Sequence, residues 1–283
     1  MKLFRWFVFF VFVLLVMMCS YLLLYRRWNH LWAIEPKRVS YPIIKHQDDT
    51  IRVVMIGDSW SGMHYENGMD DNLCGLLFHI TRKPIIVQSK GNGGEKSKGI
   101  YRLMFDNGEY GTKSIFLNGA DYCVVFAGIN DAAANLGTKQ FCAHYRMILD
   151  FLLANGIRPV VIEVPDVDIW NIYGDKPKKD LLTDYIKSLM TRCGMYNYHE
   201  YREALYSMLH EEQLLDRVVY VSIKDWNGDG VEINPTLFLA DKIHLNRKGY
   251  EKLDECIAGA IARDLKLTQD SALVNQPVGR NPQ

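Results

Sequence analysis

Residues 52–60 have the sequence Arg52-Val53-Val54-Met55-Ile56-Gly57-Asp58-Ser59-Trp60, which changes abruptly from apolar to polar at Gly57. A short apolar run rich in β-branched residues predicts a strand that is buried on both faces, as in a parallel sheet. Ser59 then stands at the carboxyl end of that strand, where open α/β sheets place their ligand sites. A Gly-Asp-Ser tripeptide by itself is more often an ordinary turn or helix cap. The case for Ser59 as a nucleophile therefore depends on residues further along the chain.

The composition of the whole chain narrows the classes of function. The 283 residues include 33 basic and 33 acidic side chains, so no basic excess favours nucleic acid as a partner. A hydrophobic content of 48% fits one globular domain together with one membrane segment. The six cysteines have no CxxC pair and no zinc-type spacing, and their positions assign no disulfide. Several histidines also lack metal-ligand spacing and are expected to be structural or surface residues: His64, His79, His144, His199 and His210.

The amino-terminal segment predicts a transmembrane helix. About 20 residues from Trp6 to Tyr25 (the span 6–25) carry no charge, which is enough to cross the hydrocarbon core of a bilayer. This run is longer than the apolar region of a usual signal peptide, and no small-x-small cleavage site follows it. Residues 1–27 are therefore interpreted as an uncleaved signal anchor. More basic residues follow the span than precede it, which favours a cytoplasmic domain, but a short amino-terminal tail usually stays inside, and we expect the domain to face outward.

The remainder of the chain alternates short apolar runs with stretches of helical periodicity. Strands are predicted at 51–56, 84–88, 122–127, 159–164 and 218–221. Amphipathic helices are predicted around 69–80, 139–155, 179–193 and 247–267. This alternation predicts an α/β domain in which helices cover both faces of a central parallel sheet of about five strands.

The domain boundaries follow from composition. Residues 28–50 contain Pro36 and Pro42 with mixed charge, and they are expected to form a loosely packed linker. The α/β domain is assigned to residues 51–267. Residues 268–283 are polar and are expected to be disordered.

Polar groups follow the predicted strands at the points where the strands end. After Gly57-Asp58-Ser59 come the blocks Ser89-Lys90-Gly91-Asn92-Gly93-Gly94-Glu95, Gly128-Ile129-Asn130-Asp131 and, beyond the fifth strand, Asp241-Lys242-Ile243-His244. Because the carboxyl ends of parallel strands lie at one edge of a sheet, residues far apart in sequence are expected to converge there.

The residue types in these blocks suit acyl transfer. A serine hydroxyl becomes a strong nucleophile only when a base takes its proton, and His244 is the candidate base for Ser59. Asp241, three residues earlier, can hold the other ring nitrogen of the histidine. The Ser59 N–H, a glycine N–H of the second block and the Asn130 side-chain amide are candidate donors to the oxyanion. Taken singly, Asp241, His244 and Asn130 also fit helix caps or surface residues, and the glycine cluster also fits a turn.

In these blocks the chain resembles the SGNH (GDSL-type) hydrolase family over residues 51–267. Ser59 matches the nucleophile of the family's Gly-Asp-Ser block, Asn130 matches the asparagine of its Gly-x-Asn-Asp block, and Asp241 and His244 match its Asp-x-x-His block. The resemblance implies a three-layer α/β/α fold and hydrolysis of acyl esters without a metal or other cofactor.

Two positions depart from a full match to this family. Gly94, which precedes Glu95, fits the second-block glycine best, with Gly91 and Gly93 as alternatives. Trp60 follows the serine where the family's fuller motif has Leu or Ile, and it could narrow the site and contact the substrate.

The substrate is less defined than the chemistry. Trp170 and Tyr173, after the fourth predicted strand, could line an acyl groove or stack on a sugar, or simply pack their loop. A membrane-anchored serine esterase acting on O-acetyl or other short acyl esters, on carbohydrate or lipid, is the principal hypothesis. The alternatives are an O-acetyltransferase for a cell-envelope polysaccharide and a catalytically silent carbohydrate-binding module of the same fold.

Overall fold

The computed structural model describes residues 2–167, 176–228 and 233–274, and it divides into two compact units, Met1–Glu35 and Pro36–Gln283. The first unit contains helix α1 (Lys2–Trp32). Residues Lys2–Arg26 of this helix have a mean hydropathy of 2.8 and are long and apolar enough to cross a membrane, a criterion that a signal sequence also meets. The helix runs further than the span expected from sequence and ends at Trp32.

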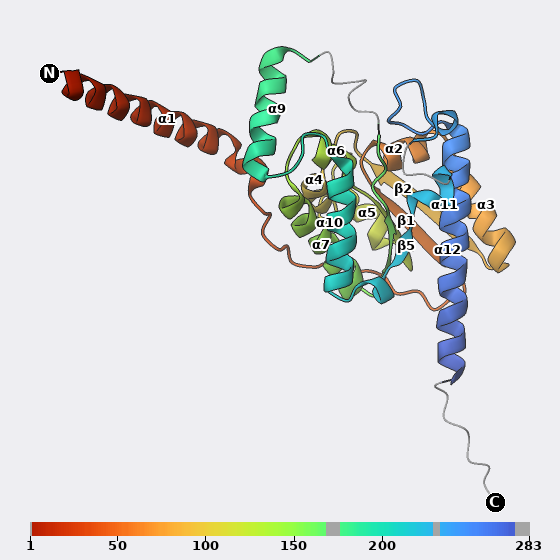
Figure 1. The fold of residues 1–283 in the computed structure, drawn as a ribbon. Coiled ribbons are helices and arrows are strands. Elements are labelled where there is room, and N and C mark those ends of the chain that lie inside the picture. The colour runs from red at the N-terminus through yellow and green to blue at the C-terminus, as the bar shows by residue number, and fades with distance from the viewer. Residues whose placement is uncertain (1, 168–175, 229–232, 275–283) are drawn as a thin grey trace, which may run out of the picture. The chain divides into compact units, whose positions relative to one another are not determined.

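The second unit is built on a five-stranded, wholly parallel sheet (Figure 1). Its strands are β1 (Ile51–Gly57), β2 (Ile85–Gly91), β3 (Tyr122–Phe126), β4 (Arg158–Ile162) and β5 (Val219–Val221). The spatial order is β2-β1-β3-β4-β5, so the order reverses between β1 and β3. The expectation of a central parallel sheet of about five strands is confirmed.

Strand β2 differs most from the sequence-based expectation, because it continues to Gly91 where the sequence predicted an end at Gln88. Ser89, Lys90 and Gly91 favour turns over strands, but each of them pairs with β1, with Gly91 opposite Gly57. Pairing with a buried neighbouring strand therefore overrides the local propensity, and it brings the second polar block to the end of β1.

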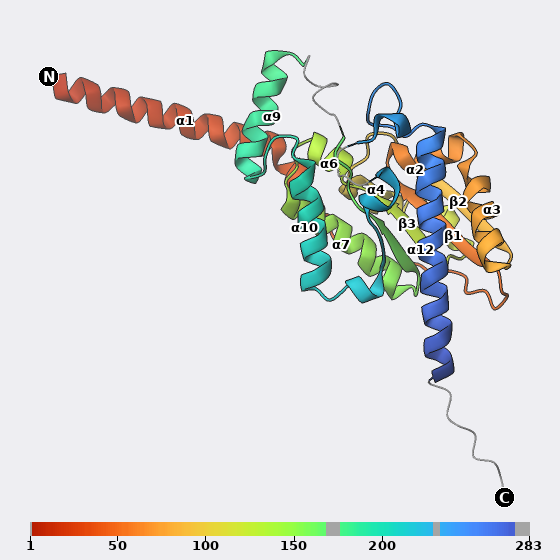
Figure 2. The same ribbon diagram turned by 45° about the vertical axis from the view of Figure 1, so that its right-hand side comes forward.

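Helices cover both faces of this sheet. On one face, α3 (Met69–Thr81) packs against α12 (Arg247–Val274), with α2 (Ser59–Glu66) and α11 (Ile223–Asn227) beside them, as Figures 1 and 2 show. On the other face, α7 (Thr138–Ala154) packs against α4 (Ser97–Leu103) and α10 (Tyr198–Glu211). The other helices and 3-10 turns among the described residues are α5 (Lys113–Leu117), α6 (Ile129–Ala133), α9 (Lys178–Thr191), η1 (Leu215–Arg217) and η2 (Pro235–Leu237). Helix α12 extends to Val274, past the predicted end at 267, and residues 275–283 lie outside the described part of the chain.

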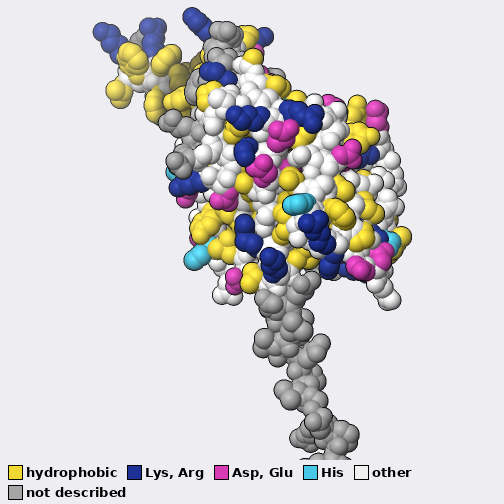
Figure 3. Space-filling view, turned by 90° about the vertical axis from the view of Figure 1, so that its right-hand side faces the viewer, with side chains coloured by type: hydrophobic (Ala, Val, Ile, Leu, Met, Phe, Trp, Pro, Cys, Tyr) yellow, Lys and Arg dark blue, Asp and Glu magenta, His cyan; other side chains and the backbone are white. Residues whose placement is uncertain are grey.

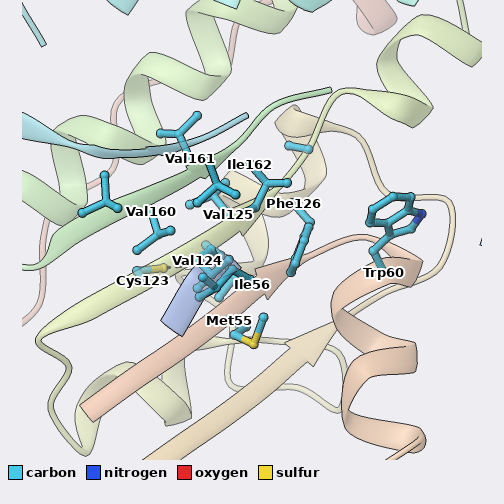
Figure 4. Close-up of a cluster of buried hydrophobic side chains, with 14 of the residues drawn as sticks. Met55, Ile56, Trp60, Cys123, Val124, Val125, Phe126, Val160, Val161 and Ile162 are labelled. Carbon is cyan, nitrogen blue, oxygen red and sulfur yellow. Dashed lines mark hydrogen bonds between the residues drawn. The ribbon is translucent and has the colours of Figure 1, made fainter. Parts of the chain in front are cut away.

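The core lies along the three central strands. Apolar residues of β1, β3 and β4 are almost completely buried, and Figure 4 shows Met55, Val124 and Val160 among them. Continuous apolar runs rather than alternating ones are what strands covered on both faces require. All six cysteines are free thiols.

Residues 36–50 have no regular secondary structure but lie against the domain. The Tyr41 hydroxyl donates to the Met104 carbonyl at 2.7 Å, and its ring packs against Phe105 and Phe151 at centroid distances of 5.7 and 5.2 Å. The prolines and mixed charge of this stretch predicted a loosely packed linker. They carry no information about the packing of Tyr41 against distant aromatic rings. This part of the linker instead belongs to the folded unit.

The surface carries charges of both signs. On the face seen in Figure 3, lysine and arginine side chains alternate with acidic and hydrophobic ones, with no expanse of a single charge. This mixture agrees with the formal net charge of zero.

Candidate active site

The candidate site lies at the carboxyl ends of the strands, beside the point where the strand order reverses. Ser59 begins α2 directly after β1, and Asn130 lies in the first turn of α6 after β3. Because β1 and β3 are hydrogen-bonded neighbours, with Gly57 opposite Phe126, the segments that follow them start side by side. Ligands of open α/β sheets bind at such a reversal.

Ser59, His244 and Asp241 form a continuous hydrogen-bonded chain. His244 Nε2 lies 3.0 Å from Ser59 Oγ, and His244 Nδ1 lies 2.7 Å from Asp241 Oδ2. In the neutral tautomer that suits both contacts, Nδ1–H donates to the carboxylate and Nε2 accepts from the serine hydroxyl. The side chains of His244 and Asp241 are 29% and 39% exposed, so the chain of hydrogen bonds opens onto solvent.

A tight turn brings Asp241 and His244 together. Asp241 Oδ1 accepts the backbone N–H groups of Ile243 and His244, each at 2.9 Å, which is the local hydrogen bonding that aspartate favours in turns. The turn is closed by an antiparallel bridge between Phe238 and Leu245. Burial acts to raise the pKa of Asp241, but the hydrogen bonds from His244 and Ile243 outweigh it and lower that pKa. The carboxylate is thus ionised when it faces the imidazole.

Asn130 is held by Asp58, a contact that the sequence analysis did not foresee. Asn130 Nδ2 donates to Asp58 Oδ2 at 3.1 Å, and the Trp60 N–H donates to Asp58 Oδ1 at 3.0 Å. Asp58 is fully buried, and this burial raises its pKa to about 7. The sequence analysis treated Asp58 as a turn residue. Its position between Gly57 and Ser59, directly before the candidate nucleophile, is the signal that could have indicated a role in the site. Asp131, which follows Asn130, instead accepts hydrogen bonds from Ser97 N and Oγ at the start of α4.

The three candidate glycines of the second block lie in different environments. A Cβ atom on Gly91 would lie 2.3 Å from the Asp58 carbonyl oxygen and 2.7 Å from Gly62 N, so Gly91 is required for close packing of β2 against α2. Added Cβ atoms on Gly93 and Gly94 would meet open space. Gly94 has φ of +76°, a left-handed conformation that glycine adopts without strain.

Trp60 is a buried residue of the aromatic core beside the site. Its side chain is 1% exposed and packs against the rings of Trp226 and Phe238 at centroid distances of 5.9 and 6.2 Å. The indole Nε1–H donates to the Ile243 carbonyl at 3.1 Å, next to His244. The expectation of a substrate contact rested on the position of Trp60 after Ser59, whereas the structure buries the ring among Phe126, Trp226 and Phe238. Trp170 and Tyr173 lie outside the described residues.

His64 lies in a second buried polar cluster. Its Nδ1 is 2.9 Å from Asp70 Oδ1 and its Nε2 is 2.9 Å from Asp254 Oδ1, so both ring nitrogens face carboxylates. Ser89 Oγ donates to Asp70, and Asn72 donates to Asp254 at 2.8 Å. Burial acts to lower the pKa of His64, but the hydrogen bonds to Asp254 and Asp70 raise it to about 9. The cluster joins α2, which begins with Ser59, to α3, β2 and α12. This position agrees with the expectation that His64 is a structural residue.

Comparisons with known proteins identify the fold. No protein-family model matches the sequence, and neither does any curated protein. A proposed acylhydrolase from Bacteroides fragilis is 18% identical, with a TM-score of 0.51 over 79% of this chain and 91% of its own. A GDSL-like lipase from Bacteroides thetaiotaomicron is 17% identical, with a TM-score of 0.50 over 84% and 97% of the two chains. A proposed lipolytic protein of the G-D-S-L family from Desulfitobacterium hafniense is also 17% identical, with a TM-score of 0.51 over 75% and 98%. The chain therefore has the three-layer α/β/α fold of the SGNH (GDSL-type) hydrolases, as the resemblance in its sequence predicted.

Proposed function

We propose that this chain is a serine esterase whose nucleophile is Ser59. The observation that carries the proposal is the hydrogen-bonded chain from Ser59 Oγ through His244 to Asp241, with successive distances of 3.0 and 2.7 Å. Nucleophile, base and orienting carboxylate within hydrogen-bond reach of one another are the arrangement that serine acyl transfer needs. The likeness in fold to GDSL-type proteins supports the same chemistry.

In the first step, Ser59 Oγ attacks the carbonyl carbon of an ester while His244 Nε2 takes the hydroxyl proton. Asp241 holds the ring through Nδ1 and stabilises the imidazolium that forms. Negative charge develops on the former carbonyl oxygen, and the Ser59 N–H, the Gly94 N–H and the Asn130 amide are proposed to bind it. Asp58 accepts one amide hydrogen of Asn130 and leaves the second for the oxyanion.

The tetrahedral intermediate then collapses, and the imidazolium gives its proton to the departing alcohol. The acyl group remains on Ser59 until a water molecule, deprotonated by His244, attacks it and releases the carboxylic acid. If a sugar hydroxyl replaced water in this step, the same residues would catalyse acyl transfer to a polysaccharide. Analysis of products with and without a sugar acceptor separates the two reactions.

We propose short acyl esters, including O-acetyl groups on glycans, as the substrate class. The exposed positions of His244 and Asp241 support an open site that can receive an ester attached to a larger molecule. We also propose that Lys2–Arg26 anchors the enzyme in a membrane, with the catalytic unit on the outer side. The length and hydropathy of α1 support the anchor.

The test uses the full chain in detergent with an activated acetyl ester. Ser59→Ala is expected to lower kcat by at least about 1,000-fold, because removing a serine nucleophile leaves only the contribution of the remaining site. A fluorophosphonate probe should label the wild-type protein and fail to label the variant. Ser40→Ala, which changes an exposed serine in the segment before β1, should keep both activity and labelling. Full activity of Ser59→Ala, or the absence of labelling in the wild type, would overturn the proposal, and the latter would favour a silent binding module.

A further inference from the structure

Helix α9 (Lys178–Thr191) turns one stripe of apolar side chains toward solvent. Leu182, Tyr185 and Leu189 are 59%, 53% and 59% exposed, and their spacing of three and four residues places them on one stripe. The buried residues of the same helix are Asp184 and Ser188. A surface helix of a soluble domain normally has the opposite arrangement, with the apolar stripe facing the core.

The inner face of α9 is fixed in place by polar contacts. The Asp184 carboxylate accepts hydrogen bonds from Lys176 Nζ at 2.9 Å, Lys187 Nζ at 3.2 Å and the Tyr196 hydroxyl at 2.5 Å. Lys176 and Tyr196 lie outside α9, so turning the helix to bury Leu182 and Leu189 would move the Asp184 carboxylate away from both of these donors. The outward orientation of the apolar stripe is therefore held by the domain itself.

Basic residues stand at both ends of the exposed stripe. Lys178 and Lys179 begin the helix, and Arg192 follows its last residue, and all of these are exposed. An apolar helical stripe with flanking cations matches the boundary between the acyl chains and the headgroups of an anionic bilayer. It matches a second copy of the chain poorly, because an antiparallel pair of these helices would bring the lysines of one copy to the arginine of the other.

We propose that the outer face of α9 binds the surface of a membrane that contains anionic lipids. Leu182, Tyr185 and Leu189 enter the region between headgroups and acyl chains, and Lys178, Lys179 and Arg192 contact the headgroup phosphates. The same chain carries an apolar helix long enough to span a bilayer, so a membrane is an available partner. This interaction is independent of the ester chemistry proposed for Ser59.

The test measures hydrogen–deuterium exchange of the full chain in lipid nanodiscs that hold one copy each. Exchange in residues 178–192 should be on the order of tenfold slower in discs with anionic lipids than in detergent, because membrane contact protects the helix. Discs of purely zwitterionic lipid should protect less. The double variant Leu182→Ser/Leu189→Ser should lose the protection, and Lys178→Gln/Lys179→Gln should lose the difference between the lipids.

The matched control is Phe78→Ser/Ile80→Ser, which removes two exposed apolar side chains from α3 and should leave the exchange of α9 unchanged. Equal exchange of α9 in detergent and in anionic discs would overturn the proposal. Protection that appears only when discs hold two copies would also overturn it, in favour of self-association. Hydrolysis of a soluble ester, measured on the same samples, separates a failure of this proposal from a failure of the esterase proposal.

Discussion

The side-chain amide of Asn130 donates to the buried carboxylate of Asp58 at 3.1 Å, which orients one candidate oxyanion donor. Two strands that are neighbours in space, β1 and β3, supply the two partners. This hydrogen bond joins the Gly57-Asp58-Ser59 block to the block that contains Asn130.

Asp58→Asn is expected to lower kcat about 10- to 100-fold with little change in KM, since it weakens the support of a donor that acts mainly in the transition state. Steady-state kinetics with a soluble ester measure this effect. If Asp58 acts through Asn130, the double variant Asp58→Asn/Asn130→Ala will be no slower than Asn130→Ala alone. If the losses in kcat of the two single variants multiply in the double variant, Asp58 has a role separate from Asn130.

Trp60→Phe is expected to lower kcat by about 5-fold, because it removes the hydrogen bond to the Ile243 carbonyl beside His244, and a neutral hydrogen bond contributes about 1 kcal/mol. Trp226→Phe is the matched control in the same aromatic cluster. The Trp226 indole nitrogen is buried without a hydrogen-bond partner among the described residues, so its removal should leave kcat unchanged. Equal effects of the two substitutions would mean that ring packing, and not the hydrogen bond, governs the position of His244.

Gly91→Ala is expected to destabilise the domain by about 2 kcal/mol or more and to abolish activity, because the new Cβ would overlap the Asp58 carbonyl. Gly93→Ala, two residues later, adds a methyl group to open space and should keep the wild-type melting temperature. Thermal unfolding followed by circular dichroism compares the two variants. A stable Gly91→Ala protein would contradict the close packing of β2 against α2.

The buried His64 cluster predicts a loss of stability at alkaline pH. The folded-state pKa of His64, about 9, lies above its ordinary value of 6.5. Its stabilising contribution is therefore complete below pH 6.5 and is lost as the pH rises through about 9, with a total on the order of 3 kcal/mol. Denaturant unfolding of the full chain in detergent between pH 6 and 10 measures how the free energy of unfolding depends on pH.

His64→Gln should lower the stability at pH 6.5 and flatten the dependence on pH, because the cation between Asp70 and Asp254 is removed. His79→Gln changes an exposed histidine of α3 and should keep the wild-type profile. An unaltered alkaline slope in His64→Gln would assign the pH dependence to other groups.

The sequence predicted the sheet and the convergence of the polar blocks, because both follow from rules that act locally along the chain. Continuous apolar runs predict buried parallel strands, and parallel strands bring Ser59, Asn130 and His244 to one edge whatever the details of packing. The environment of Trp60 depends instead on Trp226, Phe238 and Ile243, which approach only after the whole domain has folded.

The environments of His64 and of residues 36–50 could not be predicted from the sequence for the same reason. The partner Asp254 follows His64 by 190 positions, and no local periodicity connects them. Tyr41 lies in a stretch with no periodic pattern, so its docking beside Phe105 and Phe151 could be found only in three dimensions. Long-range side-chain pairing, rather than the type of secondary structure, is what the sequence left open.

The docking of Tyr41 determines where the globular unit can be separated from α1 without loss of its own contacts. Cleavage between Trp32 and Pro36 would leave the unit that begins at Pro36 with its aromatic contacts complete. Cleavage just before Ile51 would remove Tyr41 from its contacts with Phe105 and Phe151 and expose an apolar surface that favours aggregation. The position suited to recombinant truncation therefore lies about fifteen residues before β1.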